Sequence, residues 1–139
     1  MFVTFYNVVN LSKYVINYCK DQKVSITNLK LMKLLYLISV DYYDLFDTYL
    51  FPLEYIDFKS WKILGPYIPA VYNHYKYYVS LELPRQRDYV EVMKNDEQDI
   101  LNNLLDNYID CSMYKLVQLS KQKKFLDVRE EESESSFFS

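Results

Sequence analysis

A long helical pattern of apolar residues, from about residue 27 to residue 46, limits the folds open to this chain more than any other feature. Apolar side chains recur there at steps of three and four, which places them on one face of a helix. That face consists of Leu31, Leu34, Leu35, Ile38, Tyr42 and Leu45, widened by Leu29, Met32, Tyr36 and Val40. A helix that is apolar around so much of its circumference is normally packed on several sides. The pattern predicts one compact domain, mainly α-helical, built around this central helix.

Four further helices are expected, over about residues 5–20, 71–79, 95–108 and 110–119, from the same kind of spacing. Thr27 or Ser25 can cap the central helix, and Asp110 or Ser112 can cap the last one. Asn95 with Gln98 three residues later resembles a capping box. The first helix has a polar back, formed by Asn10, Lys13, Asn17 and Lys20.

Two short segments rich in β-branched and aromatic residues are predicted to be strands. They are residues 58–63 and Tyr89–Val92, and their pairing would give a small two-stranded β element. The domain is expected to span residues 1–126. Residues 127–139 are acidic and serine-rich, which predicts a mobile tail.

The single glycine of the chain, Gly65, lies between Trp61 and Pro69. A chain that uses one glycine is expected to place it at a positive φ or where another group approaches the backbone closely. Pro66 fixes its own φ and disfavours helical backbone at Gly65, and Pro69 suits the first turn of a helix. These residues predict an extended segment, a sharp turn and a helix start.

Charge and cysteine usage narrow the possible partners. The net charge is −3, and residues 127–139 hold five acids and one base, so residues 1–126 hold 15 bases and 14 acids. With a net charge this close to zero, residues 1–126 lack the basic stripe that nucleic-acid binding requires. We see no secretory signal and no apolar run long enough to span a membrane. Cys19 and Cys111 lack paired spacing, which indicates reduced thiols and a cytoplasmic protein.

Three stretches, in order, resemble the Panacea domain, a family of SocA-like antitoxins and phage-associated proteins. The first is the N-terminal helix over residues 8–23. The second is similar to the family's Thr-Asn-Leu…Lys-Leu-Leu-Tyr run and comprises Thr27, Asn28, Leu29, Leu31, Lys33, Leu34, Leu35 and Tyr36. The third is similar to its Trp…Gly-Pro…Pro-x-x-Tyr run and comprises Trp61, Gly65, Pro66, Pro69, Tyr72 and Tyr75. The resemblance covers roughly residues 6–120.

The resemblance implies an antitoxin that neutralises a cognate toxin by direct binding, without catalysis, cofactor or metal. The chain departs from the family near its C-terminal end. Ser120 and Lys121 stand where the family has Thr-His, and the Trp that follows in the family is missing. Trp61 also lies one residue further from Gly65 than the family pattern, and Leu64 replaces an aromatic residue.

Several side chains are candidates for contact with a partner. Trp61, Tyr67, Tyr72 and Tyr75 can form an aromatic anchor of the type that dominates interfaces, or can pack the turn onto the central helix. Asp44 and Asp47 lie near the C-terminal end of the central helix, where its dipole disfavours acids, and this suggests a basic partner.

Two alternative functions stay open from the sequence. One is a nucleic-acid-associated protein that regulates its own operon, using Lys115, Lys121, Lys123 and Lys124. The other is a small hydrolase built on His74, the only histidine. The antitoxin interpretation is preferred because the motifs carry it, whereas spacing places no third group beside His74.

Overall fold

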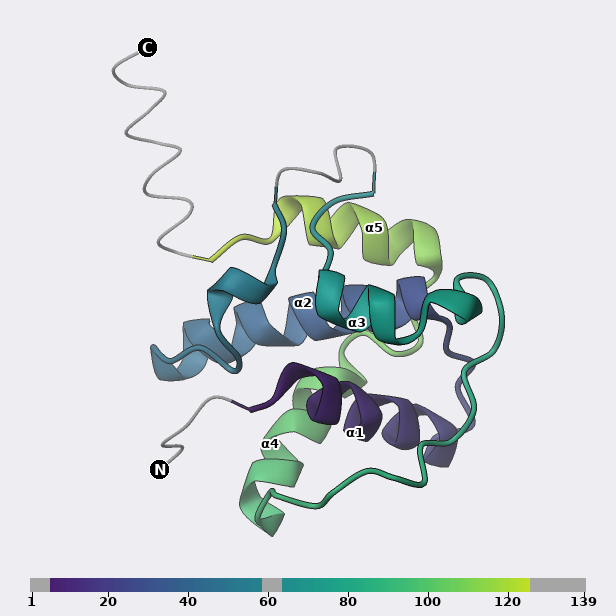
Figure 1. Cartoon of the computed structure of the whole chain (residues 1–139). Coiled ribbons are helices and arrows are strands. Elements are labelled where there is room, and N and C mark those ends of the chain that lie inside the picture. The colour runs from purple at the N-terminus through teal and green to yellow at the C-terminus, as the bar shows by residue number, and fades with distance from the viewer. Residues whose placement is uncertain (1–5, 59–63, 126–139) are drawn as a thin grey trace.

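A computed structural model describes residues 6–58 and 64–125 of the chain. Within these ranges the chain folds into five α-helices and two short 3-10 helices (Figure 1). The α-helices are α1 (Val8–Asp21), α2 (Asn28–Phe46), α3 (Pro69–His74), α4 (Asn95–Asp106) and α5 (Met113–Gln122). The 3-10 helices are η1 (Leu53–Tyr55) and η2 (Lys76–Tyr78). The predicted mainly helical architecture is confirmed.

Helix α2 is the centre of the fold and packs against α1, α3, α4 and α5 (Figure 1). Buried side chains surround it for most of its length, and they belong to one continuous core cluster. Polar Lys33 and Ser39 are buried with the apolar side chains, because neighbouring elements cover every face. Leu45 is an exception to the predicted apolar face, since it lies beyond the packed part of the helix and is exposed.

Helix ends follow the predicted capping residues in two cases. Thr27 Oγ1 accepts a hydrogen bond from the Lys30 N–H at 3.4 Å, and Ser112 Oγ accepts one from the Lys115 N–H at 3.1 Å. The start of α4 differs from the predicted capping box, because Lys94 is the N-cap and its side chain makes no capping bond.

The segment predicted as a helix over 71–79 is shorter than expected. Helix α3 begins at Pro69, as the proline predicted, and ends at His74. The 3-10 turn η2 then follows directly after Tyr75. The prediction overran because Val79 continues the helical spacing in sequence although its side chain is exposed.

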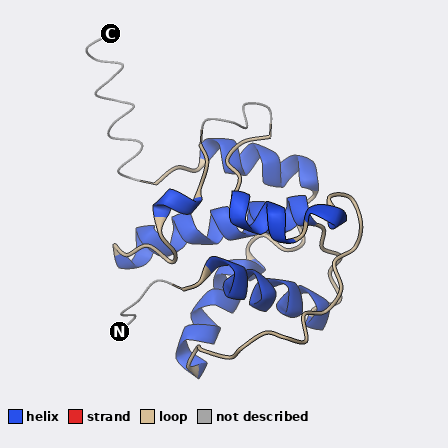
Figure 2. Cartoon of the chain, viewed as in Figure 1, coloured by secondary structure: helices blue, strands red, loops and turns tan. Residues whose placement is uncertain are grey.

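The predicted pairing of two strands is wrong for the described residues, which contain no sheet (Figure 2). Tyr89–Val92 is not a strand, and residues 59–63 lie outside the described ranges. One isolated antiparallel bridge joins Asp57 to Tyr67, with N···O distances of 2.8 and 3.2 Å. It closes the loop around Gly65.

No helix in residues 6–58 or 64–125 combines the length and apolar character needed to cross a bilayer. The predicted acidic tail, residues 127–139, lies outside the described part of the chain.

Candidate functional site

The second and third motifs meet at a corner formed by Lys33 of α2 and the loop through Gly65. The Lys33 side chain is fully buried, with 0 % of its surface exposed. Its Nζ donates hydrogen bonds to the carbonyl oxygen of Leu64 and, at 3.0 Å, to that of Pro66. A lysine therefore fastens the turn to the central helix through the backbone on both sides of Gly65. We call Lys33, the 64–66 turn and the part of α5 beneath it the Lys33 corner.

Gly65 is required at this corner for two reasons. Its φ is +84°, a backbone conformation that residues with a Cβ rarely adopt. A Cβ placed there would lie 2.9 Å from Ser120 Oγ and 3.3 Å from Lys121 Cγ, both on α5. The sequence predicted either a positive φ or a close approach, and the structure has both. Ser120 and Lys121 of α5 are thus the side chains that pack on the glycine.

The surroundings of Lys33 stabilise its charged form less than water does. Burial, with a further contribution from the positive charge of Lys121, lowers the pKa of Lys33 to about 8. Two carbonyl oxygens offset part of the cost of burying the ammonium, because each accepts a hydrogen bond from it. The pKa of this lysine therefore lies much nearer neutral pH than the ordinary value of 10.5.

Asn28 joins the same two motifs at the N-terminal end of α2. Its side chain is buried, and Nδ2 donates to the carbonyl oxygens of Tyr72 and Tyr75 at 3.1 Å each. The Tyr72 carbonyl lies in the last turn of α3, where the helix supplies no donor, and the Tyr75 carbonyl also accepts from the Tyr78 N–H at 2.9 Å. Asn28 Oδ1 is the one buried side-chain oxygen or nitrogen of the described residues without a hydrogen-bond partner. Asn28 and Lys33 together hold the described part of the third motif, residues 64–75, onto α2.

The remaining motif residues of α2 build the core. Leu31, Leu34 and Tyr36 are buried, and Leu29 is half-buried. The Tyr36 hydroxyl donates to the carbonyl oxygen of Lys123 at 2.7 Å, which ties the end of α5 to α2. Trp61, which was predicted to belong to both the third motif and the aromatic anchor, lies outside the described residues.

The candidate contact residues separate into buried and accessible ones. Tyr75 is buried, and its hydroxyl lies 3.1 Å from Ser12 Oγ, so it presents no surface to a partner. Tyr67 and Tyr72 are half-buried beside the corner, with ring centroids 6.2 Å apart in an edge-to-face arrangement. Asp44 and Asp47 are exposed at the far end of α2. The corner and the two acids are therefore separate surfaces.

A second polar cluster, which sequence reasoning missed, fixes α5 to α2. Lys123 Nζ forms an ion pair with Asp41 Oδ1 at 2.6 Å and donates to the Tyr108 hydroxyl at 2.9 Å. The Tyr108 hydroxyl donates in turn to the other Asp41 oxygen. Asp41 therefore belongs to this cluster and not to the exposed acidic surface of Asp44 and Asp47.

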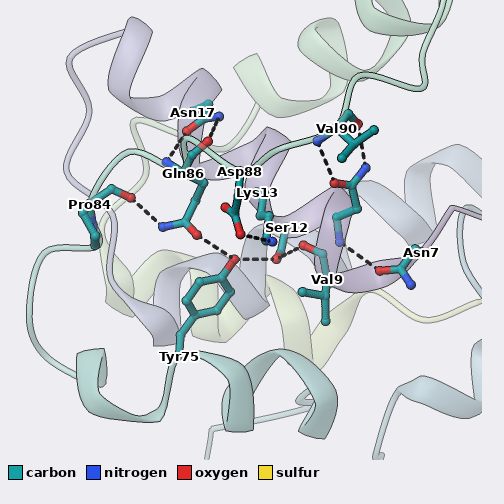
Figure 3. Close-up of polar contacts among 11 residues, drawn as sticks. Asn7, Val9, Ser12, Lys13, Asn17, Tyr75, Pro84, Gln86, Asp88 and Val90 are labelled. Carbon is teal, nitrogen blue, oxygen red and sulfur yellow. Dashed lines mark hydrogen bonds and ion pairs between the residues drawn. The ribbon is translucent and has the colours of Figure 1, made fainter.

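The polar back of α1 binds residues 84–92, a non-helical segment with a turn at Arg87 and Asp88 (Figure 3). Asn17 accepts from the Gln86 N–H at 2.7 Å and donates to the Gln86 carbonyl at 2.9 Å. Asn10 does the same with Val90, at 3.1 and 2.9 Å. Each asparagine side chain thus pairs with a peptide group as a neighbouring strand would. This explains why the β-favouring residues 89–92 have no strand partner.

His74, on which the hydrolase alternative rests, is positioned by the last turn of α3. His74 is exposed at the end of α3, with its ring 4.6 Å from that of Tyr75. No group of three or more His, Cys, Asp or Glu side chains in the described ranges is arranged to hold a metal ion.

A cavity of about 400 Å³ lies between α1, α4 and residues 85–91. Tyr14 and Tyr89 form part of its wall, with ring centroids 5.8 Å apart, and Arg85 at its edge pairs with Asp21 at 2.6 Å.

Comparison with known proteins adds no relative: no family model, curated protein or solved structure matches this chain. The resemblance to the Panacea family therefore remains a prediction from the motifs.

Proposed function

We propose that this chain is an antitoxin-type binding module, which neutralises a partner toxin by direct protein–protein contact and performs no chemistry itself. The observation that supports the proposal is the Lys33 corner. There the two most specific stretches of the resemblance interlock through two buried side chains, Asn28 and Lys33.

The aromatic rim of this corner is the contact surface we favour. Tyr67 and Tyr72 are partly accessible, and their backbone is held rigidly from below by Asn28 and Lys33. A rigid aromatic surface loses little conformational entropy on binding, and tyrosine is among the residues that contribute most to interfaces. Loop residues positioned by a rigid scaffold are also a common place for binding function.

Co-expression with the product of the adjacent gene tests the function. We expect the chain to restore growth of cells that express that product, and the two purified proteins to form a complex in calorimetric titration. Tyr72→Ala should weaken this binding at least tenfold, whereas Tyr114→Ala, at an exposed tyrosine on α5, should leave it unchanged.

Three results separate the proposal from its alternatives. Absence of both growth rescue and binding would contradict an antitoxin function. Binding to DNA of the chain's own promoter, with a steep dependence on salt, would instead support the regulatory alternative. Hydrolysis of a model ester that is lost in His74→Ala would support the hydrolase alternative.

A further inference from the structure

The two ends of α2 carry exposed apolar residues together with opposite charges. At the N-terminal end, the loop after α3 exposes Tyr77, Val79 and Leu81, by 78, 46 and 61 % of their surfaces. At the C-terminal end, Leu45 and Phe46 are 63 and 39 % exposed, and Tyr55 of the next element, η1, is 43 % exposed. We call these surfaces the loop patch and the α2-end patch.

The loop patch is held firmly at both of its ends. On one side, Tyr75 is buried, and its carbonyl accepts the Asn28 hydrogen bond. On the other, Glu82 accepts from the Ile26 N–H at 2.9 Å and pairs with Lys20 at 2.5 Å, and the next residue, Leu83, is buried. The exposed side chains therefore project from a fixed base rather than from a loose loop.

The charges around the loop patch are positive. Lys20 pairs with Glu82 and Arg85 pairs with Asp21, so these four charges offset one another. Lys23, Lys30 and Lys76 make no ion pair within the described residues. The patch is thus an apolar surface with an excess of positive charge.

The charges around the α2-end patch are negative. Asp44, Asp47 and Glu54 are exposed there. Of these, Asp47 and Glu54 are in no ion pair of the described part of the chain. The C-terminal end of a helix also carries a partial negative charge, which adds to that of the carboxylates. Each patch therefore places side-chain charges next to the end of the α2 dipole that has the same sign. Within one molecule these like charges repel each other.

The two patches cannot meet within one molecule. Helix α2 has 19 residues, so its ends are about 28 Å apart. The loop patch begins next to Tyr75, whose carbonyl binds Asn28 at one end of α2, whereas Leu45 and Phe46 lie at the other end. Complementary apolar and charged surfaces at opposite ends of a rigid body can pair only between molecules.

We propose that the chain self-associates head to tail, with the loop patch of one copy seated on the α2-end patch of a second copy. This contact joins different surfaces of the two copies, so it leaves one patch free at each end of a pair and permits longer chains. The contact is small, so we expect weak association, with half-saturation on the order of 100 μM. The proposal does not depend on a toxin partner.

Sedimentation velocity of the full chain tests this proposal. The mass should rise above the monomer value of 16.9 kDa as the concentration increases, and the rise should shrink in 0.5 M NaCl because salt screens the charge pairs. Tyr77→Ser with Leu81→Ser removes the loop patch, and Leu45→Ser with Tyr55→Ser removes the α2-end patch. Each double variant alone should remain monomeric.

Mixing the two double variants gives the sharpest result. Each retains one intact patch, so an equal mixture should form dimers and no longer species. The matched control, Val92→Ser with Tyr114→Ser, removes exposed apolar side chains elsewhere and should associate as the unmodified chain does. A chain that stays monomeric at millimolar concentration, patch variants that associate normally, or a mixture that stays monomeric would each overturn the proposal.

Discussion

Replacing Gly65 with alanine tests the account of the Lys33 corner most directly. An L-residue at φ +84° costs about 1–2 kcal/mol. The new Cβ would also lie 2.9 Å from Ser120 Oγ, which is buried and donates to the Val117 carbonyl at 2.8 Å. Moving Ser120 aside would break that hydrogen bond, at a cost of about 1 kcal/mol. Because alanine stiffens the unfolded chain, about 0.4–1 kcal/mol is recovered. We expect a net loss of about 2 kcal/mol.

The free energy of unfolding is measured by urea denaturation, followed by circular dichroism at neutral pH. A double-mutant cycle with Ser120→Ala separates the two causes, because it removes the crowded oxygen and leaves the backbone strain. Gly65→Ala should then cost about 1 kcal/mol less in the Ser120→Ala background than in the unmodified chain.

Two results would refute this reasoning. If Gly65→Ala changed stability by less than about 0.5 kcal/mol, neither the positive φ nor the contact with α5 would constrain the position. If the cost were the same in both backgrounds, the contact with Ser120 would contribute nothing and backbone strain alone would explain the glycine.

Four further predictions follow from single contacts. Burial lowers the pKa of Lys33 to about 8, so the unfolded chain holds this proton up to higher pH than the folded chain. The contribution of Lys33 to stability should therefore rise between about pH 8 and 10.5, by on the order of 2 kcal/mol. Burial raises the pKa of the Cys19 thiol and of the Tyr14 hydroxyl, and these groups lose stability in the same range. The measured quantity is therefore the difference in free energy of unfolding between the unmodified chain and Lys33→Met in urea titrations, which should shift by that amount in favour of the unmodified chain. Asn28→Asp replaces a donor with a carboxylate beside two carbonyls, so it should destabilise by several kcal/mol. Acidification should recover part of that loss, because burial would raise the pKa of the new carboxyl, and an Asn28→Asp variant equally stable at pH 4 and 7 would contradict this. Asn17→Ala should speed hydrogen exchange at the Gln86 amide with little effect on the α2 amides. Replacing Lys23, whose φ is 59°, with glycine should raise the free energy of unfolding by about 1 kcal/mol in the same urea assay. A decrease in the free energy of unfolding would show that the backbone conformation at Lys23 is unstrained.

Local sequence signals predicted the helices well because they depend on neighbours along the chain. The spacing of three and four identified α2, and the hydroxyl side chains of Thr27 and Ser112 located two helix starts. Pro69 marked the first residue of α3 for the same reason, since its fixed φ and missing N–H act within one turn. Each of these signals involves only residues a few positions apart in the sequence, so it can be recognised without the tertiary structure.

Contacts between distant segments could not be read in the same way. The pattern of Tyr89–Val92 favours a strand, but α1 lies beside this segment and its asparagine side chains take the backbone hydrogen bonds. Asn10 and Asn17 are two helical turns apart, which is a visible spacing in the sequence. Nothing in that spacing says that an extended peptide lies along them.

The sequence by itself determined that the chain is helical, that α2 is central and that Gly65 occupies a constrained turn. Only the tertiary structure decided what constrains it: Lys33 binds the turn from one side, and Ser120 of α5 closes on it from the other. Lys33 lies 32 residues before Gly65, and Ser120 lies 55 residues after it. The physical reason is that φ preferences and helical periods act over a few residues, whereas burial of a lysine beneath a loop depends on which segments the core brings together.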